Sequence, residues 1–140
     1  MITAIDSNVI IGFLNQDDAL NTRARRALDA AYERGGLVIC GAVYGELLAG
    51  PTRTEQFIDR FVADTDIVVD WSSSETIWRT AGDAFQKYAA RRRRQRSGVP
   101  RRILTDFYIG AHAFCNGYSL LTLDDKIYKA AFPKLRIVRA

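Results

Sequence analysis

Residues 102–113 read Arg-Ile-Leu-Thr-Asp-Phe-Tyr-Ile-Gly-Ala-His-Ala, a stretch typical of a helix that is apolar almost all round. Its one acid is Asp106, and the residues three and four positions further on, Ile109 and Gly110, offer a carboxylate no partner. A carboxylate on the buried side of a helix must be protonated, paired or bound to a cation. The stretch therefore predicts that the fold brings other functional groups to Asp106.

A strip of arginines lies directly upstream of this helix and contains no acid. It comprises Arg91, Arg92, Arg93, Arg94, Arg96, Arg101 and Arg102. The whole chain has 20 basic and 16 acidic residues, so the remainder is net acidic and the positive charge is local. Guanidinium groups bind phosphate with paired hydrogen bonds, and the strip therefore predicts contacts with a nucleic-acid backbone. A solvated loop that keeps the protein soluble is the alternative.

The rest of the chain alternates between short apolar segments and amphipathic ones. Strands are expected at residues 2–5, 37–40, 67–69, 119–122 and 135–138. Helices are expected at residues 7–14, 21–34, 41–49, 54–63, from the serines 72–74 up to the arginine strip, from Asp106 to 116, and at 125–132. This alternation predicts an α/β fold, a three-layer α/β/α sandwich with a central, mostly parallel sheet, in one domain over residues 1–140.

Composition excludes several other classes of protein. No apolar run approaches the roughly 20 residues that a membrane span needs, and we expect no signal peptide, no membrane contact and a cytoplasmic location. Cys40 and Cys115 lack the spacing of a metal site and are expected to be reduced thiols of the core. Because His112 is the only histidine, a zinc site or a catalytic triad is disfavoured, and a structural imidazole is expected.

Four acids are expected at one edge of the sheet. Asp6 ends the first strand, Glu46 lies in the helix after the second, Asp106 begins its helix, and Asp124 follows the Leu120–Thr122 segment. Functional sites of open parallel sheets lie at the carboxyl ends of the strands. Taken singly, each has a structural alternative: helix capping for Asp6 and Asp106, a turn for Asp124, and an exposed helix face for Glu46.

Taken together, the acids predict a metal site. Like charges a few ångströms apart require a counter-charge, and an all-oxygen ligand set favours a hard cation, Mg²⁺ or Mn²⁺. Such a cation beside a basic strip suits phosphodiester hydrolysis, because it activates water and stabilises charge on the phosphate. Asn8 and Thr122 are expected to orient the carboxylates.

The chain resembles the PIN-domain ribonucleases and, among them, the VapC-type toxins of bacterial toxin–antitoxin pairs. The resemblance runs over nearly the whole length. Its motifs are residues 5–9 (Ile-Asp-Ser-Asn-Val), 43–50 (Val-Tyr-Gly-Glu-Leu-Leu-Ala-Gly), 105–113 (Thr-Asp-Phe-Tyr-Ile-Gly-Ala-His-Ala) and 121–124 (Leu-Thr-Leu-Asp), followed by 132–135 (Phe-Pro-Lys-Leu). Each motif alone is weak, but the four in this order are fairly specific.

The resemblance implies a metal-dependent endoribonuclease, usually homodimeric and inhibited by a cognate antitoxin. It makes Asp6 and Asp106 the principal Mg²⁺ ligands, with Glu46 completing the acidic pocket. Asp124 fits a fourth acidic position that varies across the family, and its neighbour Asp125 is a supporting residue there. The alternative is a PIN-like module that binds RNA or a protein without cutting. The apolar faces of residues 21–34 and 54–63 suit a dimer or an antitoxin, and the sequence does not separate these uses.

Overall fold

The computed structural model describes residues 1–95 and 102–140. Five parallel strands form one sheet in the order β3-β2-β1-β4-β5. Their bounds are Ile2–Ile5 (β1), Gly36–Cys40 (β2), Ile67–Asp70 (β3), Ser119–Thr122 (β4) and Ile137–Arg139 (β5). The strands are short and mostly apolar, as expected for a parallel sheet that is covered on both faces.

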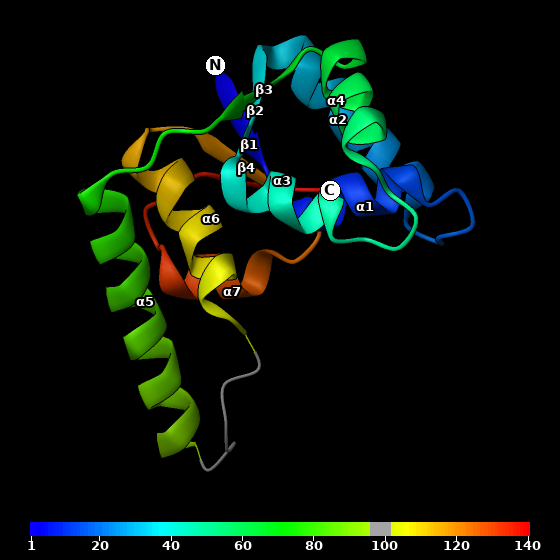
Figure 1. Cartoon of the computed structure of the whole chain (residues 1–140). Coiled ribbons are helices and arrows are strands. Elements are labelled where there is room, and N and C mark those ends of the chain that lie inside the picture. The colour runs from blue at the N-terminus through cyan, green and yellow to red at the C-terminus, as the bar shows by residue number, and fades with distance from the viewer. Residues whose placement is uncertain (96–101) are drawn as a thin grey trace.

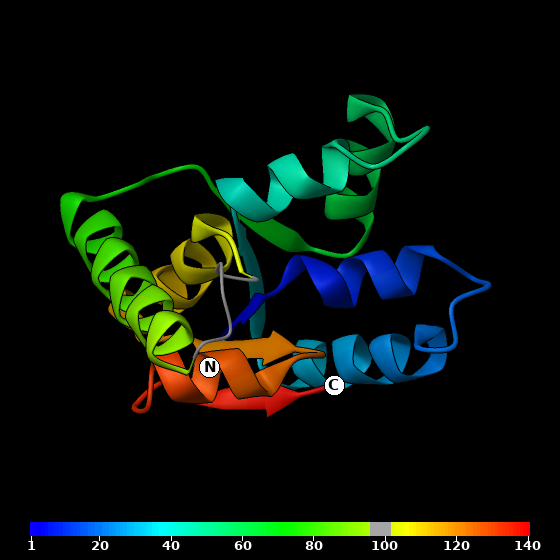
Figure 2. The ribbon, with the colours of Figure 1, turned by 90° about the horizontal axis from the view of Figure 1, so that it is seen from below.

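Seven helices connect and cover these strands in the described part of the chain. They are Ser7–Leu14 (α1), Asn21–Arg34 (α2), Gly41–Leu48 (α3), Glu55–Asp64 (α4), Glu75–Arg94 (α5), Leu104–Cys115 (α6) and Asp125–Ala131 (α7). Helices α1 to α4 lie on one side of the sheet and α5 to α7 on the other (Figures 1 and 2). The predicted three-layer α/β/α arrangement is therefore confirmed.

The strand order reverses between β1 and β4. From β1 the chain first builds outward to β2 and β3, then crosses to the other side of β1 and continues through β4 to β5. Right-handed crossovers put the helices of the two halves on opposite faces. The reversal opens a crevice at the carboxyl ends of β1 and β4, where open α/β sheets bind ligands. In the register of this pair, Ile5 lies opposite Leu121, so Asp6 and Thr122 follow side by side.

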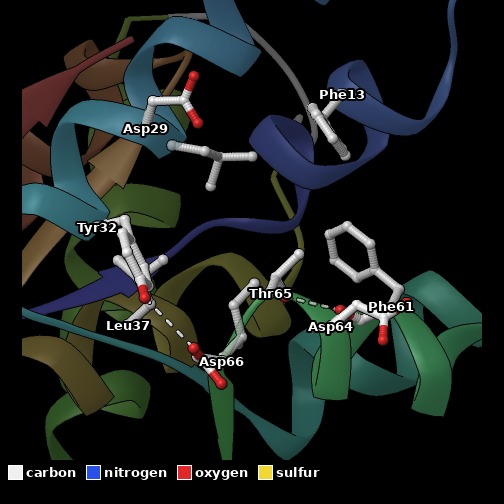
Figure 3. Close-up of a pocket in the computed structure, with 10 residues that line it drawn as sticks. Phe13, Asp29, Tyr32, Leu37, Phe61, Asp64, Thr65 and Asp66 are labelled. Atoms are coloured by element: carbon white, nitrogen blue, oxygen red, sulfur yellow. Dashed lines mark hydrogen bonds between the residues drawn. The ribbon is translucent and has the colours of Figure 1, made fainter.

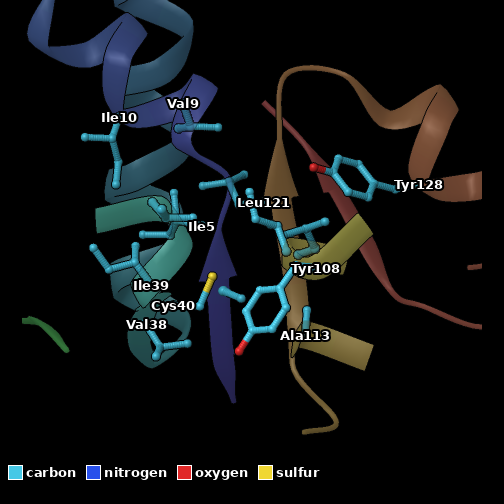
Figure 4. Close-up of a cluster of buried hydrophobic side chains, with 14 of the residues drawn as sticks. Ile5, Val9, Ile10, Val38, Ile39, Cys40, Tyr108, Ala113, Leu121 and Tyr128 are labelled. Carbon is cyan, nitrogen blue, oxygen red and sulfur yellow. The ribbon is translucent and has the colours of Figure 1, made fainter. Parts of the chain in front are cut away.

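The core fills the space between the sheet and both helical layers. Ile5, Ile39 and Leu121 come from three neighbouring strands, and Val9 and Ile10 come from α1 (Figure 4). All five are almost completely buried. Because α1 begins almost directly after β1, this packing fixes the position of Asp6, which lies between them, and of Ser7, the first residue of α1.

Some predicted boundaries and environments were wrong. Helix α5 does not stop before the arginines but includes Arg91 to Arg94, because arginine is a good helix former. Helix α6 begins at Leu104, so Asp106 lies in its first turn and is not its N-cap. Cys40 is buried as expected, whereas Cys115 is exposed at the end of α6. No helix in the described residues has the length and apolar character needed to cross a membrane.

Candidate acidic site

Asp6 is the most buried acid of the crevice, with 5% of its surface exposed. One carboxylate oxygen, Oδ2, accepts hydrogen bonds of 2.9 Å from the hydroxyls of Thr122 and Tyr128. Burial raises the pKa of Asp6 above its ordinary value, the two hydroxyl bonds oppose this rise, and the nearby charge of Asp106 adds to it. The side chain is thus a desolvated carboxyl in a fixed orientation beside a second acid.

Glu46 reaches the same place from α3. Its Oε1 accepts a 3.1 Å hydrogen bond from the hydroxyl of Ser7, which also lies 3.5 Å from Oδ1 of Asp6. Partial burial raises the pKa of Glu46, and the charges of Asp6 and Asp106 raise it further. Ser7 therefore stands between two carboxylates that repel each other.

Asp106 enters from the first turn of α6, on the other helical layer. Its Oδ2 accepts a 3.3 Å hydrogen bond from the backbone N–H of Ile103, which holds the carboxylate at the start of the helix. Its charge raises the pKa of both Asp6 and Glu46. Three of the four predicted acids thus act on one another electrostatically at the point where the strand order reverses.

The chemistry of these donors fits a hard cation. Three carboxylates and the Ser7 hydroxyl offer only oxygen, with no thiol or imidazole among them. Over residues 1–95 and 102–140, however, no three acidic, histidine or cysteine side chains converge tightly enough to hold a metal ion as they stand. Each carboxylate accepts a hydrogen bond from its own donor: Asp6 from Thr122 and Tyr128, Glu46 from Ser7, and Asp106 from the backbone of Ile103.

Asn8 and Thr122 form a hydrogen-bond network beside the Asp6 carboxylate. The Thr122 hydroxyl donates to Asp6 and accepts from the backbone N–H of Asp124 at 3.0 Å. The Asn8 amide donates to the Thr122 hydroxyl at 3.4 Å, and its oxygen accepts from the N–H of Leu123 at 3.2 Å. These bonds tie the end of β4 to α1 and hold the Asp6 carboxylate from one side.

Asp124 and Asp125 face different partners. The carboxylate of Asp124 forms an ion pair with the guanidinium of Arg102. Asp125 pairs with Lys129 at 2.6 Å and lies 3.8 Å from Arg139, and the Lys129 hydrogen bond lowers its pKa. Asp125 thus links the first turn of α7 to β5, through contacts with Lys129 and Arg139 and not with Asp6.

The described members of the arginine strip lie in two places. Arg91 to Arg94 form the last turn of α5, where Arg93 and Arg94 are exposed. Arg102 lies shortly before α6, and its backbone N–H donates to the Tyr88 hydroxyl at 3.2 Å. Arg96 and Arg101, which the sequence also predicted to contact nucleic acid, lie outside the described residues. The guanidinium of Arg102 reaches Asp124 on the acidic side of the crevice.

A model of the PIN domain matches residues 3–133. The chain belongs to the PIN-domain family. The match covers all four acids, so the sequence-based resemblance is confirmed at the level of the family. Comparison with curated proteins finds no significant match.

Solved structures with the same fold include toxin–antitoxin complexes and a toxin. VapBC2 from Rickettsia felis, bound to a DNA fragment from its promoter, has a TM-score of 0.69 at 18% identity, covering 100% of this chain and 99% of that one. VapBC-1 from nontypeable Haemophilus influenzae has a TM-score of 0.68 at 23% identity, covering 99% and 98%. VapC20 from Mycobacterium tuberculosis, a sarcin-ricin loop cleaving toxin, has a TM-score of 0.64 at 15% identity, covering 96% and 98%. At these identities the likeness shows the fold.

One residue of this PIN domain's site was missed by sequence reasoning. Tyr128 lies on α7, is 2% exposed, and donates its hydroxyl to Asp6. In the sequence, Tyr128 is one of several apolar residues of the α7 segment, and nothing in the pattern distinguishes it from the others. The direction of the Tyr128 side chain depends on how α7 packs against the sheet, and the sequence pattern does not specify this packing.

His112 is buried away from the acids. Its Nε2 lies 2.8 Å from Oδ2 of Asp70, at the end of β3, and its ring packs against Tyr118. The hydrogen bonds from Ser72 and His112 lower the pKa of Asp70. The only histidine of the chain thus has a structural environment, as the sequence indicated.

A separate pocket of about 190 Å³ opens between α2 and α4. Phe13, Leu28 and Phe61 give it an apolar floor, and Asp29, Asp64 and Asp66 lie at its rim (Figure 3). The Tyr32 hydroxyl donates to Asp66 at 3.3 Å across one side. This pocket joins the two apolar helix faces that the sequence predicted to bind a protein.

Proposed function

We propose that this PIN domain is a Mg²⁺-dependent endoribonuclease and the toxin of a toxin–antitoxin pair. The observation that carries the proposal is the placement of Asp6, Glu46 and Asp106, which come from three separate elements: Ser7 contacts both Asp6 and Glu46, and the charge of Asp106 raises the pKa of both. A fold that only needed to be stable would gain nothing from collecting three repelling acids beside a buried strand end.

Each residue of the site has a separate role in the proposed reaction. Asp6, Glu46 and Asp106 would hold Mg²⁺, with Mn²⁺ as a substitute, and Asp124 is a further acid at the mouth. When bound, the cation supplies Lewis-acid activation of water and of the phosphodiester. Thr122 and Tyr128 fix the Asp6 carboxylate, and Ser7 holds Glu46 beside it. Arg102, with the exposed arginines of α5, would bind the phosphates of the RNA.

A module that binds RNA or a protein without cutting remains the second candidate. It would keep the fold and the arginines but would have no use for the desolvated Asp6 carboxyl. The burial of Asp6 and the nearby charge of Asp106 both disfavour its ionised form, and a bound cation would offset both, so the hydrolytic function is the better supported of the two.

An antitoxin is the partner that fits the α2–α4 pocket. The similar solved structures include toxin–antitoxin complexes, and this pocket combines an apolar floor with three aspartates at its rim. A segment with large apolar side chains and flanking lysine or arginine would complement it. We also propose that the chain forms a homodimer, which light scattering of the purified protein tests.

Cleavage of RNA tests the proposal. The purified chain, free of any antitoxin, is incubated with total RNA in Mg²⁺ and in EDTA, beside Asp106→Asn and the control Asp17→Asn. Asp17 is an exposed acid after α1. We expect discrete fragments from the wild type and the control in Mg²⁺ alone, and none from a folded Asp106→Asn. Equal cleavage by folded Asp106→Asn would contradict the assignment.

A further inference from the structure

An aromatic pocket of about 370 Å³ borders the acidic crevice and has no role in the proposed hydrolysis. Trp71, Ser72 and Ser73 line it from the connection between β3 and α5, Trp78 from α5, and Thr105 and Tyr108 from α6. The first residues of α3 complete it. Figure 2 shows the β3–α5 connection running from beside α3 to the start of α5.

The aromatic rings are exposed yet held in place. Trp71 is 66% and Trp78 52% exposed, which is unusual for the largest apolar side chain. The ring of Trp78 lies 4.5 Å from that of Tyr108, and the ring of Trp71 lies 4.8 Å from that of Tyr44, edge on. These neighbours restrict the two indoles, so a planar ligand would meet surfaces that are already ordered.

Hydroxyl groups surround the rings. The Tyr108 hydroxyl donates to Oγ of Ser73 at 3.0 Å, and Ser72 and Thr105 add two more hydroxyls to the lining. Stacking faces with hydrogen-bonding groups around them are what proteins use to bind an unstacked nucleobase. The pocket therefore combines aromatic faces with hydroxyl groups among its lining residues.

The pocket and the acids share two helices. Thr105 precedes Asp106 in the first turn of α6. Ala42 lines the pocket four residues before Glu46 on α3, a separation of about 6 Å along the helix axis. A base in the pocket would therefore lie within about one nucleotide of a phosphodiester at the acids.

We propose that this pocket binds one unstacked base of the RNA, next to the phosphodiester that is cut. The inference rests on the proposed function, which it deepens by naming a base-binding subsite. The occupant is a nucleobase stacked on Trp78 or Trp71, with its edge toward Ser72, Ser73 and Thr105. A second copy of the chain seated on the same rings is the competing occupant, and the experiment separates the two.

Tryptophan fluorescence reports on the pocket directly, because Trp71 and Trp78 are the only two tryptophans of the chain. The inactivated Asp106→Asn protein is titrated in EDTA with six-nucleotide RNAs of a single base type, and with an abasic ribose-phosphate chain of equal charge. We expect at least one base-containing RNA to quench the fluorescence and to bind more tightly than the abasic chain.

Variants then locate the effect, with affinity measured by the anisotropy of a labelled RNA. At least one of the two variants Trp78→Ala and Trp71→Ala should lower the affinity for the base-containing RNA by about 5- to 100-fold. The affinity for the abasic chain should change little. Trp78→Phe should retain part of the affinity, because phenylalanine still stacks. Tyr32→Ala removes an aromatic residue of similar exposure from α2 and should change neither affinity.

Several results would overturn the proposal. Equal binding of the abasic chain, or unchanged affinity in both alanine variants, would exclude a base-binding pocket. Conversion of a dimer to a monomer by either variant in light scattering, with no base-dependent loss, would assign the rings to a second copy. Because the titration uses no metal and an inactivated variant, its result is independent of whether the wild type cleaves RNA.

Discussion

Asp6 illustrates how single residues set the properties of this site. Its carboxylate follows a buried strand, and the hydroxyls of Thr122 and Tyr128 fix one of its oxygens. Thr122 is part of β4 itself and Tyr128 is a turn of α7 away, so the orientation of one acid depends on two elements. The remaining oxygen, Oδ1, faces Ser7 and the acids beyond it.

Replacement of Tyr128 by phenylalanine isolates one of these contacts. Tyr128→Phe keeps the buried ring but removes the hydroxyl from Asp6. We expect the free energy of unfolding to fall by about 1–3 kcal/mol, because a buried carboxyl loses a donor, and Mg²⁺ affinity to fall because the carboxylate is less firmly held.

The control for this variant is Tyr32→Phe, which removes a hydroxyl–carboxylate bond on the surface. Urea unfolding and calorimetric titration with Mg²⁺ compare the two. Equal effects of both variants would show that the Tyr128 hydroxyl has no special part in holding Asp6.

At this scale the sequence predicted the acids better than their surroundings. Asp6 and Thr122 end strands that pair in parallel, so their meeting follows from strand order alone. Asp125 and Lys129 are four residues apart on one helix, a spacing that predicts their ion pair. The spacing alone does not show whether Asp125 forms this pair or takes part in the acidic site. The Arg102–Asp124 ion pair joins residues 22 positions apart in the sequence, and no sequence pattern indicates that they meet.

Packing between elements determines how closely α6 approaches the end of α7. A Cβ at Gly110 would lie 3.1 Å or less from three atoms of the Phe132 ring, and that ring is buried. Gly110→Ala should therefore destabilise the protein by about 1–3 kcal/mol through overpacking.

Gly82 in α5 provides the matched control. Its Cβ would meet nothing within 4 Å, so Gly82→Ala should stabilise the protein by about 0.5–1 kcal/mol through helix propensity. Thermal unfolding measures both changes. A neutral Gly110→Ala would mean that α6 and α7 can separate without loss of core packing.

Asp70 accepts hydrogen bonds from Ser72 and contacts His112 of α6, and these interactions make stability depend on pH. The pKa of Asp70 is lowered in the folded chain. Its contribution is therefore present above the ordinary aspartate pKa of about 3.9 and is lost as the pH falls through the lower, folded value. The stability advantage of the wild type over Asp70→Asn should shrink below about pH 4. Urea unfolding from neutral to acid pH checks this, and a difference that stays constant or grows on acidification would contradict it.

Element types and their order were predictable from periodicity, because each strand and helix has its own apolar pattern. The extension of α5 to Arg94 was not, because the pattern of buried residues ends at Ala89 while helix propensity continues. The exposure of Cys115 was missed for a related reason. It lies at the last position of α6, where the helix has passed beyond the core.

Over the whole molecule, charge is segregated in a way that suits a polyanion. The chain has a net charge of +4, with arginines concentrated around the end of α5 and acids in the crevice and at the α2–α4 pocket. RNA phosphates would meet the arginines first, and the crevice would receive the strand only with a cation present.

Salt dependence of RNA binding tests this division. The double variant Arg93→Ala/Arg94→Ala removes two exposed charges from the last turn of α5. We expect weaker binding at low salt, and a slope of log affinity against log salt reduced by about 1.4, from roughly 0.7 per phosphate contact to single strands. Arg26→Ala, an exposed arginine on α2, is the control. An unchanged slope in the double variant would assign Arg93 and Arg94 to solvation alone.

The central claim is that acids from three elements act together on one hard cation. Calorimetric titration of Mg²⁺ into the wild type, Asp106→Asn and the control Asp17→Asn tests it most directly, because it requires neither the RNA target nor the antitoxin. We expect saturable binding by the wild type and by Asp17→Asn, and at least about tenfold weaker binding by a folded Asp106→Asn. Equal Mg²⁺ affinity in all three proteins would contradict the account.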